Sequence, residues 1–244
     1  MFDSFDPLIL DALRRNGIVV VPGLSKSDIG ECSSYLRGTS CYTEHVKVYS
    51  DAIARSFEDS EKLTDVWCHE MTDVVMAPNF FELTLKYASI AADYLDTSPF
   101  MYSMNAFWTK TSSNAPKMDL QTWHRDHDDE RFLALFVYGT DVFTEADGPH
   151  QFKVGTHNGA EDGEIRTMYG PAGTAFLADT RGLHMGRKPT RLGCRRLLLW
   201  ARWSVSVRPW AYDNDKLAPV AATLLGDRYS TDPVVRNQIR LVVA

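Results

Sequence analysis

The sequence predicts a mainly β domain, built as an antiparallel sandwich or barrel with helices in front of it. Short aromatic and β-branched runs follow one another between about residues 99 and 206, separated by Gly, Pro, Asn and Asp. No helical pattern lies between these runs, which disfavours a parallel sheet with crossover helices. The 244 residues are enough for one domain with a substantial core and few for two. We therefore expect a single domain over residues 1–244, with helices in the N-terminal part and mixed loop and helix at the C-terminal end.

The first 40 residues are expected to form a helix, a strand and a second helix. Asp6 is a suitable N-cap for the first helix, and Gly17 can supply the left-handed residue that ends it. The sequence IVVVPG at 18–23 is typical of a short strand that ends in a turn. Ser25, followed three residues later by an acidic residue, predicts the start of a second helix that runs to about Gly38.

The next elements are less regular until the β-rich core begins. Residues 40–75 are polar and poorly periodic, which predicts loop with some helix. Between 78 and 95, FFELTLKYASIAADYL has apolar residues at helical spacing and predicts one amphipathic helix. The strands expected in the core are FMYSMNAFW, RFLALFVYGTDVF, TAFLAD and RRLLLWARWSV. After Arg208 the pattern returns to mixed loop and helix.

Composition and charge argue against several classes of function. The net charge of −6 leaves no basic excess with which to bind nucleic acid or an anionic membrane surface. The N-terminus lacks the features of a signal peptide, and no apolar run approaches the roughly 20 residues of a membrane-spanning helix. The 4 cysteines are scattered without CxxC spacing, which favours free thiols in a reducing compartment. We expect a cytoplasmic protein with a small-molecule substrate; the sequence does not indicate its oligomeric state.

The densest group of reactive side chains is the segment QTWHRDHDD at 121–129. On a strand, residues two positions apart project to the same face, so His124 and Asp126 can converge on one point. Two ligands fill only part of a coordination sphere, and the best third ligand is His184, which follows the expected strand TAFLAD. Two imidazoles and one carboxylate that leave other positions open suit non-haem Fe(II), with room for a chelating keto acid and O₂. A structural zinc site would instead close its coordination shell.

An arginine beyond the third ligand favours an oxygenase over the alternatives. Arg195 opens RRLLLWARW, 11 positions after His184, and the turn between them can bring its strand back beside the metal. Arginine binds a carboxylate through two parallel hydrogen bonds, so Arg195 is expected to hold the far carboxylate of 2-oxoglutarate. Arg196 should point to the opposite face, so only one of the pair can serve. A zinc-dependent hydrolase with the same His/Asp/His set and a non-catalytic cupin-like binding protein remain open alternatives.

Together these motifs resemble the phytanoyl-CoA dioxygenase family of Fe(II)/2-oxoglutarate-dependent oxygenases. The resemblance covers about 99–206 and rests on four features: QxWHxD at Gln121–Asp126, DGPHQFKVGTHNG at Asp147–Gly159, GLHMG around His184, and the arginine 11 positions later. The second feature is similar to the GPL…PGSH segment of the family, with threonine and valine in place of serine and proline.

The resemblance implies a double-stranded β-helix, which is a jelly-roll core of the cupin type. It also implies an enzyme that couples decarboxylation of 2-oxoglutarate to succinate with oxidation of a C–H bond. The matching positions imply His124, Asp126 and His184 as Fe(II) ligands and catalytic residues, Arg195 as the co-substrate arginine, and Asn105 as a further co-substrate contact. Relatives that halogenate replace the metal carboxylate by a small residue, so Asp126 favours hydroxylation.

Other residues near these motifs are given structural roles or none in catalysis. His157 is expected to stabilise a turn, and His150 could line the cavity. His127 adjoins the three ligands and is either a residue that supports them or a simple exposed histidine. Surface or core roles are the default for Arg125, Arg131, Arg181, Trp108, Trp123, Trp200, His45 and His69. A lid is expected from the N-terminal helices and the loop at 111–120, which contains SSNAPK.

Overall fold

A computed structural model describes residues 7–42, 53–111, 121–206 and 240–241 of the chain. Its elements are α1 (Pro7–Asn16), β1 (Ile18–Val21), α2 (Lys26–Arg37), β2 (Cys41–Tyr42), α3 (Phe57–Leu63), β3 (Val66–His69), α4 (Met71–Met76), α5 (Phe80–Lys86), α6 (Ala88–Leu95), β4 (Phe100–Lys110), β5 (Phe132–Tyr138), the 3₁₀ helix η2 (Glu145–Asp147), β6 (His150–Lys153), the 3₁₀ helix η3 (Thr156–Asn158), β7 (Ile165–Met168), β8 (Ala175–Ala178), β9 (His184–Gly186), β10 (Arg195–Ser204) and β11 (Arg240–Leu241).

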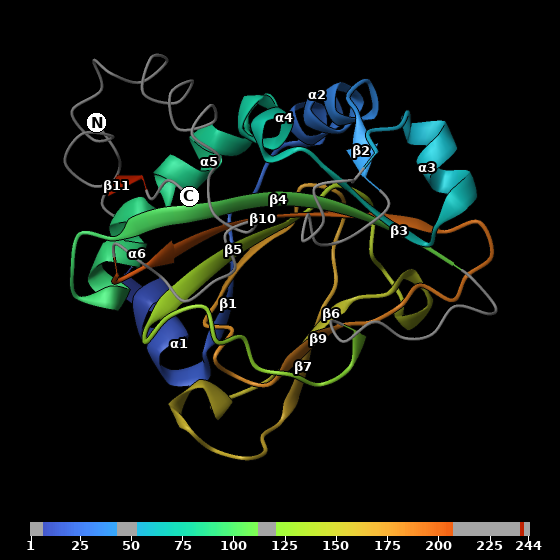
Figure 1. Ribbon diagram of the computed structural model, residues 1–244. Helices are drawn as coiled ribbons and strands as arrows, with labels where there is room; N and C mark the ends of the chain where they lie inside the picture. Colours follow the sequence, from blue (N-terminus) through green and yellow to red (C-terminus); the bar gives the residue numbers. More distant parts are fainter. Residues whose placement is uncertain (1–6, 43–52, 112–120, 207–239, 242–244) are drawn as a thin grey trace.

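Two sheets face each other, a large one and a small one. Within the described ranges, the large sheet has the order β1-β8-β5-β10-β4-β3-β2, with β11 beside β4, and the small sheet has the order β7-β6-β9. All pairs are antiparallel except β11 with β4. Figure 1 shows helices on one side of the curved large sheet and the small sheet on its other side. The expected antiparallel jelly-roll core with flanking helices is confirmed.

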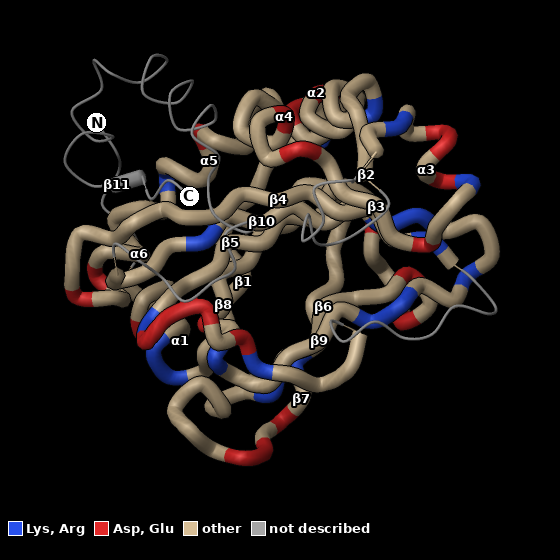
Figure 2. Tube along the Cα trace, viewed as in Figure 1, with Lys and Arg blue, Asp and Glu red and all other residues tan. Residues whose placement is uncertain are grey.

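Both faces of the large sheet are buried. On β10, Leu197 and Leu199 pack into the main core under the helices, whereas Leu198 and Trp200 pack into a second core between the sheets. Figure 2 shows the charged residues mostly on helices and loops, with the strands of the large sheet largely uncharged. A charged side chain that points between the sheets therefore leaves water and needs a polar partner there.

The N-terminal elements form as the sequence predicts. Helix α1 ends before Gly17, which has the left-handed φ of 77° expected of a helix stop. Strand β1 follows directly, and the hydroxyl of Ser25 accepts a hydrogen bond of 3.1 Å from the backbone N of Asp28 at the start of α2. Helix α2 ends at Arg37, with Gly38 as its C-cap. The expected N-cap Asp6 lies outside the described residues.

Two expectations between residues 40 and 95 are wrong in detail. The single helix expected over 78–95 is two helices, α5 and α6, because Tyr87 between them has φ −97° and ψ 3°. The Tyr87 hydroxyl donates a hydrogen bond to the carbonyl of Pro22, which anchors this break. The region 40–75 also contains strands, and β3 extends the large sheet by placing Trp67 opposite Trp108. Their stacked indole rings lie 6.2 Å apart.

Several predicted features fall outside the described ranges. These features are His45, residues 112–120 of the expected lid loop, and the tail after Arg208. Of that tail, the structure describes only β11. In the part of the chain that the structure covers, no helix has the length and apolar character needed to cross a bilayer.

Candidate metal centre

The HxD segment lies beside β9. The backbone N of His124 donates to the carbonyl of His184 at 3.0 Å, and the reverse hydrogen bond has the same length, which makes an isolated antiparallel bridge. The backbone N of Asp126 donates to the carbonyl of Thr180 at 2.9 Å. This pairing makes the segment locally extended, so that His124 and Asp126 project to one face as strand alternation predicts.

The side chains of His124, Asp126 and His184 form a cluster whose ligand atoms all lie within 4.8 Å of one another. Nε2 of His124 lies 3.6 Å from Oδ1 of Asp126, and Nε2 of His184 lies 3.7 Å from Oδ2 of the same carboxylate. No other group of this kind occurs among the described residues. The structure thus brings the three predicted ligands together, although they come from two separate stretches of the chain.

Both imidazoles are oriented by backbone hydrogen bonds. Nδ1 of His124 lies 2.8 Å from the carbonyl O of Thr122, and Nδ1 of His184 lies 2.9 Å from that of Gly182. Because a carbonyl can only accept, each Nδ1 carries the proton and each Nε2 keeps a lone pair for a metal ion. Nε2 of His124 is buried and has no hydrogen-bond partner within the described part of the chain. This orphaned atom and the donor set fit a bound cation.

The protonation states also suit metal binding. Burial raises the pKa of Asp126, but the neighbouring Arg202, His184 and His124 outweigh it and lower the pKa to about 2. Burial lowers the pKa of His184 below its ordinary value. At neutral pH the cluster therefore presents a carboxylate together with a neutral His184 imidazole, the forms that bind a cation without first losing a proton.

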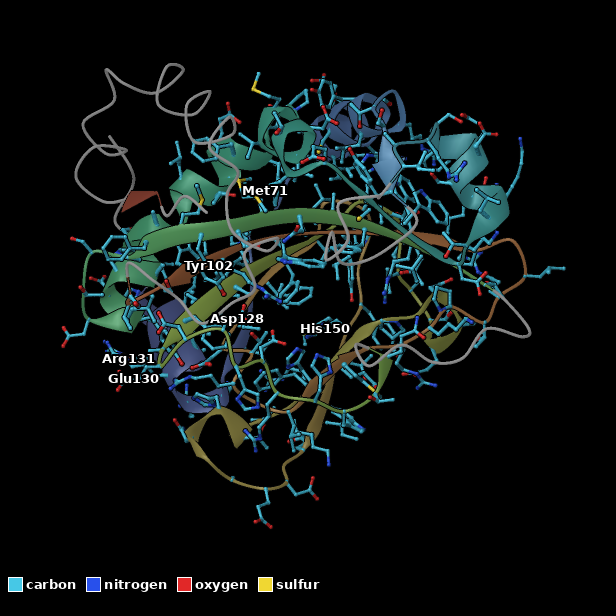
Figure 3. The ribbon with its side chains drawn as sticks, in the orientation of Figure 1. Met71, Tyr102, Asp128, Glu130, Arg131 and His150 are labelled. Atoms are coloured by element: carbon cyan, nitrogen blue, oxygen red, sulfur yellow. The ribbon has the colours of Figure 1, made fainter. Side chains whose placement is uncertain are left out.

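Arg202 contacts the carboxylate of Asp126 and links it to a second aspartate. Its Nη2 lies 3.2 Å from Oδ2 of Asp126, and its Nη1 donates to Oδ2 of Asp128. The hydroxyl of buried Tyr102 donates to the same Asp128 oxygen at 2.5 Å (Figure 3). This network was not predicted from the sequence. A signal for it exists, because Asp128 follows Asp126 at the same two-residue spacing and Arg202 is the one charged residue in the apolar run LLLWARW at 197–203.

The prediction that Arg195 faces the metal is wrong. The Arg195 side chain is 46% exposed and makes an ion pair with Glu61 of α3. Its alternate neighbours on β10, Leu197 and Leu199, point toward the helices, on the opposite face of the sheet from the second core. The one-residue alternation of a strand therefore places Arg196, and not Arg195, on the inner face.

Arg196 is a buried cation without a carboxylate partner among the described residues. Only 6% of the residue is exposed, and Nη1 donates to the carbonyl oxygens of Gly148 and Arg187. Its Nε is buried and has no partner in the described part of the chain. Burial lowers the pKa of Arg196, but a guanidinium remains charged at neutral pH. A buried positive charge of this kind is costly unless an anion reaches it.

Two further predicted residues lie on the inner face. Asn105 is opposite Trp200 in the β4–β10 register, and its amide donates to the hydroxyl of Ser103 at 2.6 Å. Its role as a co-substrate contact stays a prediction. His150 begins β6, is 2% exposed, and stacks on His184 with ring centroids 5.6 Å apart. It therefore lies closer to the three candidate metal ligands than its place in the sequence suggested.

The residues that were given structural roles make structural contacts. Nε2 of His157 lies 3.0 Å from a backbone carbonyl of α1. Arg125 donates to three backbone carbonyls, and Arg181 pairs with Asp179 at 2.6 Å. His69 accepts a hydrogen bond of 3.0 Å from a buried indole.

Comparisons with known proteins give a likeness in structure only. Neither a protein-family model nor a curated protein sequence matches this chain. Among solved structures, HygX from Streptomyces hygroscopicus, with nickel and 2-oxoglutarate bound, is 12% identical, with 82% of this chain and 87% of HygX covered at a TM-score of 0.57. The non-heme alpha ketoglutarate dependent epimerase SnoN from nogalamycin biosynthesis is 17% identical, with coverages of 82% and 84% and a TM-score of 0.58. The non-heme monooxygenase ThoJ, in complex with nickel, is 18% identical, with coverages of 86% and 82% and a TM-score of 0.55.

The chain has the jelly-roll fold of these enzymes. The alignments cover more than four fifths of this chain in each case. At these identities the likeness is one of fold, and the function has to be argued from the residues of the site.

Proposed function

We propose that this protein is an Fe(II)/2-oxoglutarate-dependent oxygenase that hydroxylates a C–H bond of a small molecule and converts 2-oxoglutarate to succinate. The observation that carries the proposal is a buried arginine without a carboxylate partner among the described residues, on the same face as a cluster of two histidines and one aspartate. The motif resemblance further supports a place close to the phytanoyl-CoA dioxygenase family.

His124, Asp126 and His184 would hold the metal. Three ligands on one face of an ion leave positions for a chelating keto acid and O₂, which is the arrangement of non-haem Fe(II) oxygenases. When bound, Fe(II) and 2-oxoglutarate would activate O₂, which is the oxidant for both the C–H bond and 2-oxoglutarate, the latter leaving as succinate and CO₂. HygX is a protein of the same fold with nickel and 2-oxoglutarate bound, which supports the same pair of cofactors here.

Arg196 takes the role that the sequence suggested for Arg195. The far carboxylate of 2-oxoglutarate needs a fixed cation in a site sheltered from water, and Arg196 needs an anion for the same reason. Its orphaned Nε offers a donor that the protein itself does not use in the described residues. This complementarity favours a dicarboxylate over a monocarboxylate keto acid.

The remaining inner-face residues orient the reactants and exclude water. Arg202 fixes the rotation of the Asp126 carboxylate, so that its ligand oxygen is presented to the metal in one orientation. Phe107, Phe136 and Trp200 make the wall between the sheets apolar. Asp126 is itself the argument for hydroxylation over halogenation, because it occupies the coordination position that a halide would need.

The test is an anaerobic titration of the metal-free protein with Fe(II) and then 2-oxoglutarate. We expect one Fe(II) per chain and a weak visible charge-transfer band that appears only when both are present. Admission of air should then yield succinate, with more of it when an accepted small molecule is present. Asp126→Ala should bind Fe(II) more weakly, because one of the three ligands is removed, and it should lose hydroxylation.

Two results would replace this proposal. A wild-type protein that binds Zn(II) and hydrolyses esters or amides without responding to 2-oxoglutarate would favour the zinc-dependent hydrolase, which uses the same ligand types. A protein that binds 2-oxoglutarate without forming succinate in air would favour a cupin-like binding protein. Release of an epimerised product would keep the cofactors and change the outcome, since SnoN of the same fold is an epimerase.

A further inference from the structure

His150 carries a buried imidazole nitrogen that the described residues leave without a hydrogen-bond partner. The residue is 2% exposed, and its Nε2 has no partner within the described ranges. An unsatisfied buried donor or acceptor costs free energy that a leucine or phenylalanine at the same position would not. The position tolerates an aromatic ring, since the imidazole packs against Phe136 and Phe176 at centroid distances of 5.0 and 5.2 Å. Packing alone therefore does not explain a histidine here.

The position of the ring suggests what the nitrogen contacts. His150 stacks on His184 at an interplanar angle of 22°, and it lies between the two sheets (Figure 3). Arg196 lies close to this part of β6, because its guanidinium donates to the carbonyl oxygens of Gly148 and Arg187, and His150 is paired with Gly186. His150 is not part of the metal cluster, because its nitrogens fall outside the group of mutually close ligand atoms.

We propose that His150 is a further co-substrate-binding residue, whose Nε2–H donates a hydrogen bond to a carboxylate oxygen of 2-oxoglutarate. This inference rests on the proposed function. A keto acid chelated at the three ligands and held at Arg196 would have its carbon chain between these two points. The His150 ring stacks on His184, and Arg196 contacts the carbonyl of Gly148, two residues before His150. Each carboxylate oxygen can accept more than one hydrogen bond, so an imidazole N–H there would add a donor to those of the guanidinium.

The consequence is a selective loss of co-substrate affinity when the nitrogen is removed. His150→Phe keeps an aromatic ring against His184 and deletes the donor, whereas His150→Gln places an amide N–H near the position of Nε2. Because a hydrogen bond to a charged group is worth about 1.5–3 kcal/mol, His150→Phe should raise the Kd for 2-oxoglutarate at least about tenfold. His150→Gln should stay within about threefold of wild type.

The experiment is isothermal titration of 2-oxoglutarate into the Ni(II)-loaded full chain, preceded by titration of Ni(II) into each metal-free variant. Ni(II) affinity should be the same in all three proteins. Histidine ¹⁵N spectra of the Zn(II)-loaded wild type should also show a shift of the His150 Nε2 signal on addition of 2-oxoglutarate, with the signal identified by its absence from His150→Gln.

The outcomes separate the two proposals. No 2-oxoglutarate binding by the Ni(II)-loaded wild type would refute the proposed function and this inference with it. Tight binding by wild type and by His150→Phe alike would overturn the role of His150 and leave the proposed function intact. Equal weakening of Ni(II) and 2-oxoglutarate binding in His150→Phe would assign His150 to the support of His184 and likewise overturn it. An unshifted His150 signal would do the same even where the phenylalanine variant does not fold.

Discussion

Replacing Arg196 by methionine should remove most of the affinity for 2-oxoglutarate, whereas the same replacement of Arg195 should leave it unchanged. The two residues are adjacent in sequence and of identical chemistry, and they point to opposite faces of β10. Each variant therefore serves as the control for the other. A general effect of lost positive charge would appear in both, and an effect of the binding site only in Arg196→Met.

The magnitude follows from the contacts. A carboxylate bound to a guanidinium by two charge-assisted hydrogen bonds is stabilised by about 3 kcal/mol at the lower end, which corresponds to roughly a hundredfold in Kd. Arg195 makes a surface ion pair with Glu61 and is 46% exposed, so its loss should cost less than about 1 kcal/mol of unfolding free energy. Its replacement should not alter ligand binding.

Thermal unfolding of the Ni(II)-loaded protein measures both effects without turnover. At a 2-oxoglutarate concentration of about 100 times the wild-type Kd, the ligand should stabilise wild type and Arg195→Met by about 2.7 kcal/mol. The same concentration should stabilise Arg196→Met by only about 0.4 kcal/mol, because its Kd is a hundredfold higher. The reasoning fails if Arg196→Met keeps the full stabilisation, and it is reversed if Arg195→Met is the variant that loses it.

Three further predictions concern the support of the site and the fold. Arg202→Met should weaken Ni(II) binding about tenfold in a calorimetric titration, because Asp126 loses the group that orients it. Arg202→Lys should have an intermediate affinity, and equal Ni(II) affinities of wild type and Arg202→Met would contradict this role of Arg202. Burial lowers the pKa of His69 to about 4, so the unfolded chain takes up a proton below about pH 6.5 that the folded chain does not. Between pH 7 and pH 5, the free energy of unfolding measured with denaturant should therefore fall by about 2 kcal/mol more in wild type than in His69→Gln. Equal decreases in the two proteins would contradict a lowered pKa of His69. Gly17→Ala should lower the free energy of unfolding clearly more than Gly155→Ala does. Both glycines have a positive φ, but a Cβ at Gly17 would lie 2.5 Å from an imidazole nitrogen, whereas one at Gly155 would meet nothing within 4 Å.

Much of the fold is legible in local patterns. The caps of α2, the left-handed stop after α1 and the four main strands each depend on residues close together in the sequence. The grouping of His124 with Asp126 is equally local, because it needs only the two-residue period of an extended chain. The third member, His184, could be named because it follows a predicted strand, but its distance from the other two depends on the β9 pairing, which no local pattern specifies.

The features that were missed depend on contacts between distant segments. The helix expected over 78–95 breaks at Tyr87, whose hydroxyl bonds to the carbonyl of Pro22. Apolar spacing continues through the break, so periodicity alone predicts one helix. Strand β3 is a four-residue element in a polar region, and its identity as a strand comes from pairing with the long β4. Neither contact leaves a signal in the segment itself.

The sequence of β10 alone did not reveal which of its residues point to the inner face of the large sheet. A half-buried strand reveals its inner face by alternating apolar and polar residues, but LLLW at 197–200 is apolar at every position because both faces of the large sheet are buried. The inner face is marked by two arginines, Arg196 and Arg202, which lie an even number of positions apart and therefore point to the same side of the strand. Both lie on the inner face, and they differ in what neutralises them: Arg202 has Asp126 and Asp128, while Arg196 has backbone carbonyls alone among the described residues. Two buried cations on one strand are hard to explain by stability. Arg202 orients Asp126 of the proposed metal centre, and Arg196 fits a site that is complete only when an anion binds beside that centre.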